Sequence, residues 1–177
     1  MKELSDTKLL QRAHSGDDQA LRVLMKKYEK LIYHLCYRIL SNHEDAQDQT
    51  QEVFLEALRS ATGFRGEHRA SFRAWLCRIA CNKCHTLQRY RHRMQEMSLG
   101  ASHETEVPPP DELMVLQQAI EQLPRDYRTI IILRYAGDLS YKEIAQVLDL
   151  SDSTVGTRLY RAHKLLRKTL TKEGDMK

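Results

Sequence analysis

Basic side chains gather in two separate stretches of this sequence, where they could bind a polyanion such as a nucleic acid. Glu67 is the only acid in residues 65–93, and residues 153–172 contain none. Clustered Lys and Arg side chains neutralise phosphates, so two contacts with nucleic acid are predicted; helix faces that are merely solvated are the alternative. The basic residues are Arg65, Arg69, Arg73, Arg78, Lys83, Arg89, Arg91 and Arg93 in the first stretch, and Arg158, Arg161, Lys164, Arg167, Lys168 and Lys172 in the second.

Acidic side chains form blocks of their own. Residues 95–112 contain acids but no Lys or Arg, and so do residues 41–56. The net charge of the chain is only +4, so the distribution of charge is more informative than its total. The acidic blocks predict a surface that docks on a basic protein partner. The acids of the earlier block are Glu44, Asp45, Asp48, Glu52 and Glu56.

Sequence motifs of catalysis are missing. The chain has no Gly-rich phosphate loop, no HExxH and no GxSxG, so neither an enzyme nor a cofactor is expected. Cys77, Cys81 and Cys84 fall along one stripe of a predicted helix, with Cys36 elsewhere. The stripe lacks the paired CxxC knuckles of a structural zinc site, so core packing is favoured over a metal site. A redox-sensing or metal-responsive stripe stays open as an alternative.

The elements that position these residues are predicted to be helices throughout. Among 177 residues, 41% are hydrophobic and only 7 are Gly and 4 are Pro, which favours an all-α fold. Apolar residues at helical spacing predict helices over about 6–13, 18–40, 44–61, 70–93 and 113–123, followed by three further short helices. Residues 94–112, with three consecutive prolines, are expected to be a flexible linker.

The local signal with the most detail covers residues 139–165. Ser140 and Glu143 have the spacing of a capping box, Asp149 suits a turn, and Ser151 caps a second helix. Two helices joined by a tight turn, the second with a basic outer face, predict a helix-turn-helix that enters a DNA major groove. A helical hairpin that only packs is the alternative. The outer face holds Thr154, Thr157, Arg158, Arg161 and Lys164.

On these residues the chain resembles bacterial sigma factors of the sigma-70 family, in particular the extracytoplasmic-function (ECF) group. The later half resembles region 4 of the family through residues 123–128 (LPRDYR), 139–145 (LSYKEIA) and 151–162 (SDSTVGTRLYRA). The earlier half resembles region 2 through residues 45–54 (DAQDQTQEVF) and residues 64–66 (FRG) followed by 72–82 (FRAWLCRIACN).

The resemblance implies a division of the chain and a set of roles. It implies region 2 at residues 1–93, a linker at 94–112, region 4 at 113–172 and a tail at 173–177. Region 2 would dock on the β′ clamp coiled coil of core RNA polymerase and melt the −10 element, and region 4 would bind the β flap and read the −35 element. The implied polymerase-binding residues are Asp45, Asp48, Gln51 and Glu52. The implied −10 residues are Arg65, Gly66, His68, Arg69, Ser71, Asn82, Arg89, Arg91 and Arg93. The implied −35 residues are Arg134, Thr154, Gly156, Thr157, Arg158, Tyr160, Arg161 and Lys164.

The chain departs from the family pattern at three positions. Gly156 stands where a charged or polar residue is common, and Thr86 stands where an Asp is common. Asp149 replaces a turn glycine, which Asp can do because it tolerates the left-handed conformation.

Further expectations concern partners and location. An anti-sigma factor is an expected partner, and the two domains are expected to adopt compact and extended arrangements. No stretch of about 18 uncharged apolar residues occurs, so no membrane span is expected. The first residues lack the apolar core of a secretory signal, so a cytoplasmic location is expected. A helix-turn-helix regulator that binds operator DNA without polymerase is the main alternative function.

Overall fold

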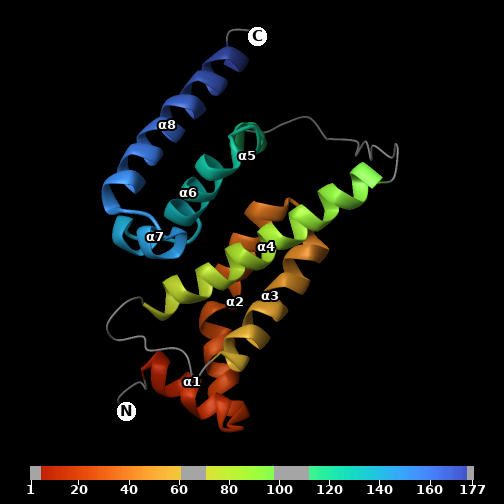
Figure 1. Ribbon diagram of the computed structural model, residues 1–177, viewed down its shortest axis with the longest axis vertical. Helices are drawn as coiled ribbons and strands as arrows, with labels where there is room; N and C mark the ends of the chain where they lie inside the picture. Colours follow the sequence, from red (N-terminus) through yellow and green to blue (C-terminus); the bar gives the residue numbers. More distant parts are fainter. Residues whose placement is uncertain (1–4, 61–70, 98–111, 175–177) are drawn as a thin grey trace.

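The computed structural model describes residues 5–60, 71–97 and 112–174, and every regular element in those ranges is an α-helix. The prediction of an all-α fold is therefore confirmed. Helices α1 to α4 form one group and α5 to α8 a second group (Figure 1). The helices are α1 (Asp6–His14), α2 (Asp18–Leu40), α3 (His43–Arg59), α4 (Phe72–Met97), α5 (Glu112–Glu121), α6 (Arg125–Tyr135), α7 (Tyr141–Leu148) and α8 (Asp152–Gly174).

Side-chain caps begin the helices of the first group. The Asp17 carboxylate accepts hydrogen bonds from the backbone N–H groups of Gln19 and Ala20, and the Asn42 side chain accepts one from Asp45. Ser41, at φ 52°, ends α2 in the left-handed conformation. Such caps satisfy backbone groups that a helix end leaves unpaired. Ser41 and Asn42 fix the sharp α2–α3 corner, which makes the two helices an antiparallel pair.

The long helix α2 is the centre of the first group. It packs against α1, α3 and α4, and α3 and α4 also pack against each other. Leu24, Ile32 and Leu35 of α2, Val53 of α3 and Leu76 of α4 are all completely or almost completely buried. This core holds α3 and α4 side by side, so their outer faces form a continuous surface.

The second group is built around α8. The core residues Ile130, Leu133, Ile144, Val155 and Leu159 come from α6, α7 and α8. The prediction that the last helix is short was wrong, because α8 continues to Gly174. No glycine or proline occurs between Gly156 and Gly174 to interrupt the helix, and Leu166 extends its buried stripe.

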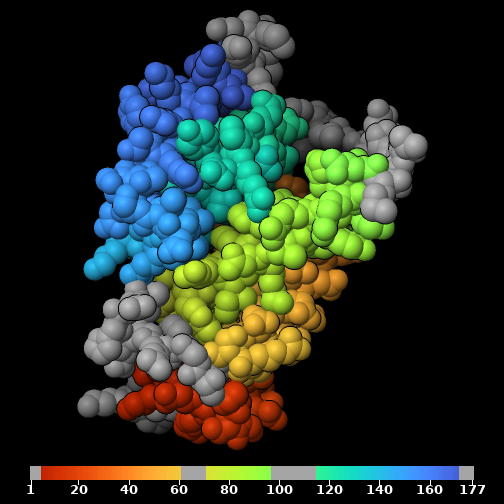
Figure 2. Space-filling model, viewed as in Figure 1, coloured from red at the N-terminus to blue at the C-terminus, as the bar shows by residue number. Residues whose placement is uncertain are grey.

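The two groups lie against each other. Helix α7 packs on the first half of α4, and α6 contacts α2. Figure 2 shows the blue and teal helices of the second group in direct contact with the green surface of α4. In the described parts of the chain, no helix is both long and apolar enough to cross a membrane.

Candidate nucleic-acid interface

The acidic face of α3 presents two of the predicted docking residues to solvent. Asp48 and Gln51 are exposed, and within residues 5–60, 71–97 and 112–174 neither side chain has a hydrogen-bond or ion-pair partner. Gln51 also lines a groove of about 590 Å³ between α2 and α3, together with Met25, Tyr33 and Phe54. An exposed carboxylate beside a partly apolar groove can bind a basic helix that also brings apolar side chains.

The other two predicted docking residues already have partners on α4. Asp45 accepts two hydrogen bonds from the Arg91 guanidinium, one of them 2.6 Å from Nη2 to Oδ1, and the Asp45 side chain is only 13% exposed. Lys83 Nζ lies 3.3 Å from Glu52 Oε2 and 3.9 Å from Glu56 Oε2. The acidic face of α3 and the basic face of α4 are therefore joined by ion pairs.

Between α3 and α4 runs a groove of about 800 Å³ that contains the predicted −10 residues Asn82 and Arg93. Asn82 is exposed, and Trp75, Lys83 and Tyr90 line the same groove. Asn82 can donate and accept hydrogen bonds, Tyr90 has an exposed ring, and the cations can contact phosphate. This combination can hold a strand of single-stranded nucleic acid.

Arg89 and Thr86 are neighbours on the same helix. Arg89 Nη2 donates a 3.1 Å hydrogen bond to the Thr86 hydroxyl. The hydroxyl thus gives the guanidinium a neutral acceptor where the family often has a carboxylate. No carboxylate at position 86 therefore competes with a phosphate for the Arg89 guanidinium.

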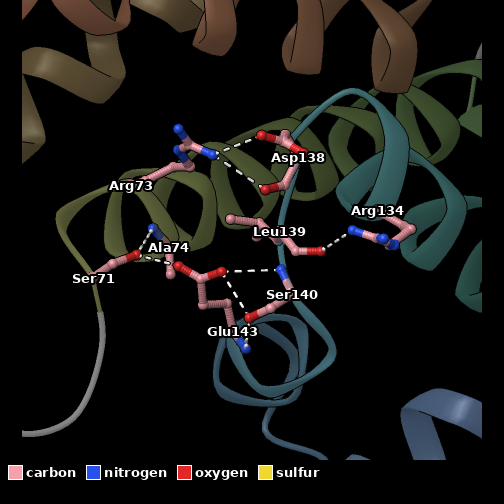
Figure 3. Close-up of polar contacts among 8 residues, drawn as sticks. All are labelled: Ser71, Arg73, Ala74, Arg134, Asp138, Leu139, Ser140 and Glu143. Atoms are coloured by element: carbon pink, nitrogen blue, oxygen red, sulfur yellow. Dashed lines mark hydrogen bonds and ion pairs between the residues drawn. The ribbon is translucent and has the colours of Figure 1, made fainter.

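The start of α4 is tied to the second group of helices (Figure 3). Ser71 caps α4 by accepting the Ala74 N–H, and its hydroxyl donates a 2.5 Å hydrogen bond to Glu143 Oε1 at the start of α7. Arg73 Nη1 donates to the backbone oxygen and to the carboxylate of Asp138, both at 3.1 Å. We call these contacts of Ser71 and Arg73 the interdomain clasp. Of the remaining predicted −10 residues, Arg65, Gly66, His68 and Arg69 lie outside the described residues.

The helix-turn-helix has the predicted local geometry. Ser140 and Glu143 form a capping box, Asp149 adopts the left-handed conformation at φ 59°, and the Ser151 hydroxyl accepts the Thr154 N–H. Hydrogen bonds from Ser71 and Ser140 outweigh partial burial and lower the pKa of the Glu143 carboxyl. The carboxylate therefore stays ionised and holds both the cap and the clasp.

The exposed face of α8 carries most of the predicted −35 residues. Tyr160 is 71% exposed, and Thr157, Arg161 and Lys164 are exposed beside it. A Cβ added at Gly156 would meet only the Tyr141 ring, at 3.9 Å, so this position leaves open space at the face. Thr154 lies in the first turn and is half-buried.

Two predicted −35 residues take part in the packing of the second group. Arg158 Nη1 lies 3.2 Å from Asp126 Oδ2, which joins α8 to α6. Arg134 donates a 3.0 Å hydrogen bond to the Leu139 backbone oxygen (Figure 3). Its guanidinium also lies over the Tyr141 ring. Both guanidiniums stabilise the turn and the helix contacts, and each stays only partly exposed.

His85 of α4 lies in the contact between the two groups. Its Nε2 is 3.2 Å from the Thr129 hydroxyl of α6. Burial, together with the nearby positive charges of Arg125 and Arg89, lowers the pKa of His85 to about 4. The imidazole is therefore neutral in this contact at ordinary pH.

The four cysteines pack in the core of the first group. Cys36, Cys77, Cys81 and Cys84 are all buried and free, and burial raises the pKa of Cys77 to about 12. A hydrogen bond with Cys36, together with burial, raises the pKa of the Cys84 thiol far above its ordinary value. Over the described ranges, no group of three or more His, Cys, Asp or Glu residues is placed to hold a metal ion. The stripe of thiols thus packs as small apolar groups, as favoured from the sequence.

The set of −10 residues expected from the sequence leaves out Lys83, Tyr90 and Arg73, although Lys83 and Arg73 belong to the basic stretch 65–93. Lys83 lies eight positions before Arg91, a spacing that puts both on one face of a helix, so helical periodicity could have found it. Tyr90 has no sequence signal beyond its place among the arginines. The pairing of Arg73 with Asp138 has no sequence signal, because the two residues are 65 positions apart.

Two family models match this chain. Residues 24–94 match the model described as Sigma-70 region 2, and residues 113–166 match the model described as Sigma-70, region 4. The ECF RNA polymerase sigma factor SigW of Bacillus subtilis (strain 168) is 34% identical to this chain, over 95% of this chain and 98% of the relative.

Two solved structures are similar over most of the chain. The structure of CnrH in complex with the cytosolic domain of CnrY has a TM-score of 0.73 at 26% identity, and covers 94% of this chain and 97% of that one. The sigma factor RpoE in complex with the anti-sigma factor NepR, from Bartonella quintana, has a TM-score of 0.70 at 24% identity, and covers 85% of this chain and 98% of that one. The second similarity is one of fold.

Proposed function

The chain belongs to the ECF group of sigma-70 family sigma factors, non-catalytic proteins that direct transcription initiation by RNA polymerase, and from this premise we propose how its surfaces divide that work. Residues 1–93 act as region 2, residues 94–112 as the linker, residues 113–172 as region 4, and residues 173–177 as a tail. Region 2 docks on polymerase and binds the −10 element, while region 4 binds the −35 element and the β flap.

The acidic face of α3 docks on the β′ clamp coiled coil. The observation that carries this proposal is the exposure of Asp48 and Gln51 beside the groove between α2 and α3. A helix of polymerase that carries Arg or Lys would find a free carboxylate, an amide and apolar side chains on one face. Charged hydrogen bonds of this kind fix the register of docking as well as its affinity.

The groove between α3 and α4 takes the melted −10 strand. Asn82 bonds an unstacked base, Tyr90 offers a stacking surface, and Arg89, Arg91 and Arg93 hold phosphates, with the loop residues Arg65, Gly66, His68, Arg69 and Ser71 around the flipped base. Unstacking a base costs a few kcal/mol, about as much as one or two base–aromatic stacking contacts return. The groove volume of about 800 Å³ supports this assignment.

The exposed face of α8 reads the −35 element in the major groove. Arg161 is the candidate for a bidentate contact with guanine, and Thr154, Thr157 and Tyr160 contact base edges or backbone. Arg134, Arg158 and Lys164 position phosphates. Gly156 leaves space that a base pair or its methyl group fills.

The contact between the two groups represents the state of the chain away from polymerase. The clasp engages Ser71, a −10 residue, so promoter melting requires the two groups to separate. An anti-sigma factor is the proposed partner that stabilises the separated or the compact form. The similarity in fold to the sigma factor RpoE, solved in complex with the anti-sigma factor NepR, supports such a partner.

We expect Asp48→Arg to abolish transcription that depends on this chain. The full-length protein and core polymerase are incubated with genomic DNA, and transcript starts are sequenced. The wild-type chain should give discrete starts that share −35 and −10 motifs. Asp48→Arg should lower their yield by about tenfold or more, since it replaces an attraction with a repulsion.

Asp18→Arg is the control. Asp18 is also exposed, but it lies at the start of α2, the end of the α2–α3 pair opposite to Asp48. This variant should keep the wild-type starts. If no starts appear with the wild-type chain and the protein alone protects duplex DNA, the operator-binding regulator is the correct function.

A further inference from the structure

Two acids on the proposed docking face of α3 already neutralise cations of α4. Asp45 holds Arg91, and Glu52 holds Lys83. Arg91 is a proposed phosphate contact, and Lys83 lines the proposed strand groove. Asp45 and Glu52 thus belong to the proposed polymerase-binding surface, and they also form ion pairs with two cations of the proposed DNA-binding surface.

The geometry makes these pairs a link between two surfaces. Asp45 and Glu52 lie seven residues apart on α3, and Arg91 and Lys83 lie eight residues apart on α4, so two turns of one helix face two turns of the other. Both pairs therefore cross the same contact between antiparallel helices. Glu52 and Lys83 also line the groove between the two helices.

Each pair has at least one partner that is open to solvent, so each can exchange that partner. Both cations are partly exposed, with side-chain exposures of 53% for Arg91 and 24% for Lys83, and Glu52 is 45% exposed. Exposed ion pairs contribute little, because water screens them and because long side chains lose entropy when they are held. A helix that brings fresh Arg or Lys side chains can therefore replace Lys83 at little cost. It can replace Arg91 where it supplies again the two hydrogen bonds that the 13% exposed Asp45 side chain accepts.

We propose that docking on polymerase exchanges these ion pairs: Asp45 and Glu52 turn from Arg91 and Lys83 to basic residues of polymerase, and the two released cations bind phosphates of the promoter strand. This inference rests on the proposed function of α3 and α4. It predicts that the free chain holds DNA more weakly than the polymerase-bound chain does, since binding at one surface raises the charge available at the other.

The test measures the binding of the free full-length chain to a fluorescently labelled oligothymidylate by anisotropy, over a series of salt concentrations. Asp45→Asn and Glu52→Gln remove a carboxylate and leave its shape. Asp45→Asn should strengthen binding by about two- to fivefold at low salt, the factor that matches the loss of one weak ion pair, and should steepen the salt dependence by about 0.7, the value for one added contact with single-stranded phosphate. Glu52→Gln should change both quantities in the same direction but by less, because Glu56 still lies 3.9 Å from Lys83.

Glu44→Gln is the matched control. Glu44 is exposed, adjacent to Asp45, and has no ion-pair partner in the described residues, so its removal changes the net charge equally and releases no cation. If Asp45→Asn and Glu52→Gln both bind the oligothymidylate only as tightly as Glu44→Gln does, the proposed exchange is overturned. In an Arg91→Gln background, Asp45→Asn should have no effect beyond that of the control, and thermal unfolding monitored by circular dichroism checks that each variant is folded.

A separate measurement distinguishes failure of the exchange from failure of the proposed function. The affinity of each chain for core polymerase is measured without DNA, and Asp48→Asn is included. If Asp48→Asn binds polymerase as tightly as the wild-type chain does, the docking proposal fails. A second outcome is that Asp48→Asn binds polymerase weakly while Asp45→Asn and Glu52→Gln bind the oligothymidylate no more tightly than Glu44→Gln does. In that case the docking proposal stands and only the exchange is overturned.

Discussion

Arg161 and Lys164 lie three residues apart on α8, and both side chains are exposed, yet their chemistry differs. A guanidinium can donate two parallel hydrogen bonds to one guanine edge, whereas an ammonium acts as a point charge. Within the described residues, neither has an ion-pair partner. Both are therefore available to DNA without breaking a contact in the protein.

At this scale, Arg161→Ala should relax sequence preference while Lys164→Ala weakens binding to every sequence. Loss of a bidentate contact costs about 1–3 kcal/mol at one base pair, whereas loss of a phosphate contact lowers the salt slope by about one. Binding of polymerase that carries each variant is measured on duplexes changed singly along the −35 element. Equal losses on all duplexes for Arg161→Ala would contradict the base-reading role.

At the scale of the element, α7 depends on its N-cap residue, Ser140. Ser140 accepts the Glu143 N–H, and Glu143 in turn accepts the Ser140 N–H, so two backbone donors at the start of α7 are satisfied by one pair of side chains. The same Glu143 receives the Ser71 hydroxyl. A defect in this cap therefore disturbs both the helix-turn-helix and the clasp.

Ser140→Ala should lower the free energy of unfolding by about 1 kcal/mol, the usual effect of losing an N-cap side chain. Urea unfolding of the full chain, followed by circular dichroism, measures this change. Ser140→Thr keeps a hydroxyl at the same position and should recover most of the loss. Equal instability of the two variants would mean that the hydroxyl is not responsible.

At the scale of the whole molecule, His85 links protonation to the packing of the two groups. Its pKa is lowered to about 4 in the packed form, against an ordinary value near 6.5. A group with a depressed pKa resists protonation, so the contact keeps its full stability above about pH 6.5 and loses it progressively as the pH falls toward 4. Below about pH 4, His85 is protonated in both the packed and the separated form, so the free-energy difference between the two forms no longer changes with pH.

Lowering the pH from about 7.5 to about 5 should therefore favour separation of the two groups. Energy transfer between dyes attached to the exposed ends of α1 and α8 reports the change, and His85→Gln should weaken its pH dependence because Gln cannot be protonated. The same pH dependence in both proteins would assign the effect to other groups. Glu143 does not account for it in this range, because its pKa is lowered from a value already near 4.5.

Several features of the molecule follow from the sequence alone, because they depend on neighbours a few residues away. Helix starts at Ser140 and Ser151, the left-handed Asp149 and the basic face of α8 come from capping, turn chemistry and helical spacing. The family motifs run in order along both halves, and the matches to region 2 and region 4 confirm the family. The length of α8 was underestimated, since nothing in its sequence marks an end before Gly174.

The partners of charged side chains were decided only by the tertiary structure. Asp45 was expected to be free for polymerase, but it holds Arg91, 46 residues away, and Ser71 meets Glu143, 72 residues away. Helical periodicity tells which face of a helix a residue occupies, whereas the packing of buried side chains decides which two faces meet and in which register. Surface charges then pair with whichever opposite charges the packing of the core has placed within reach.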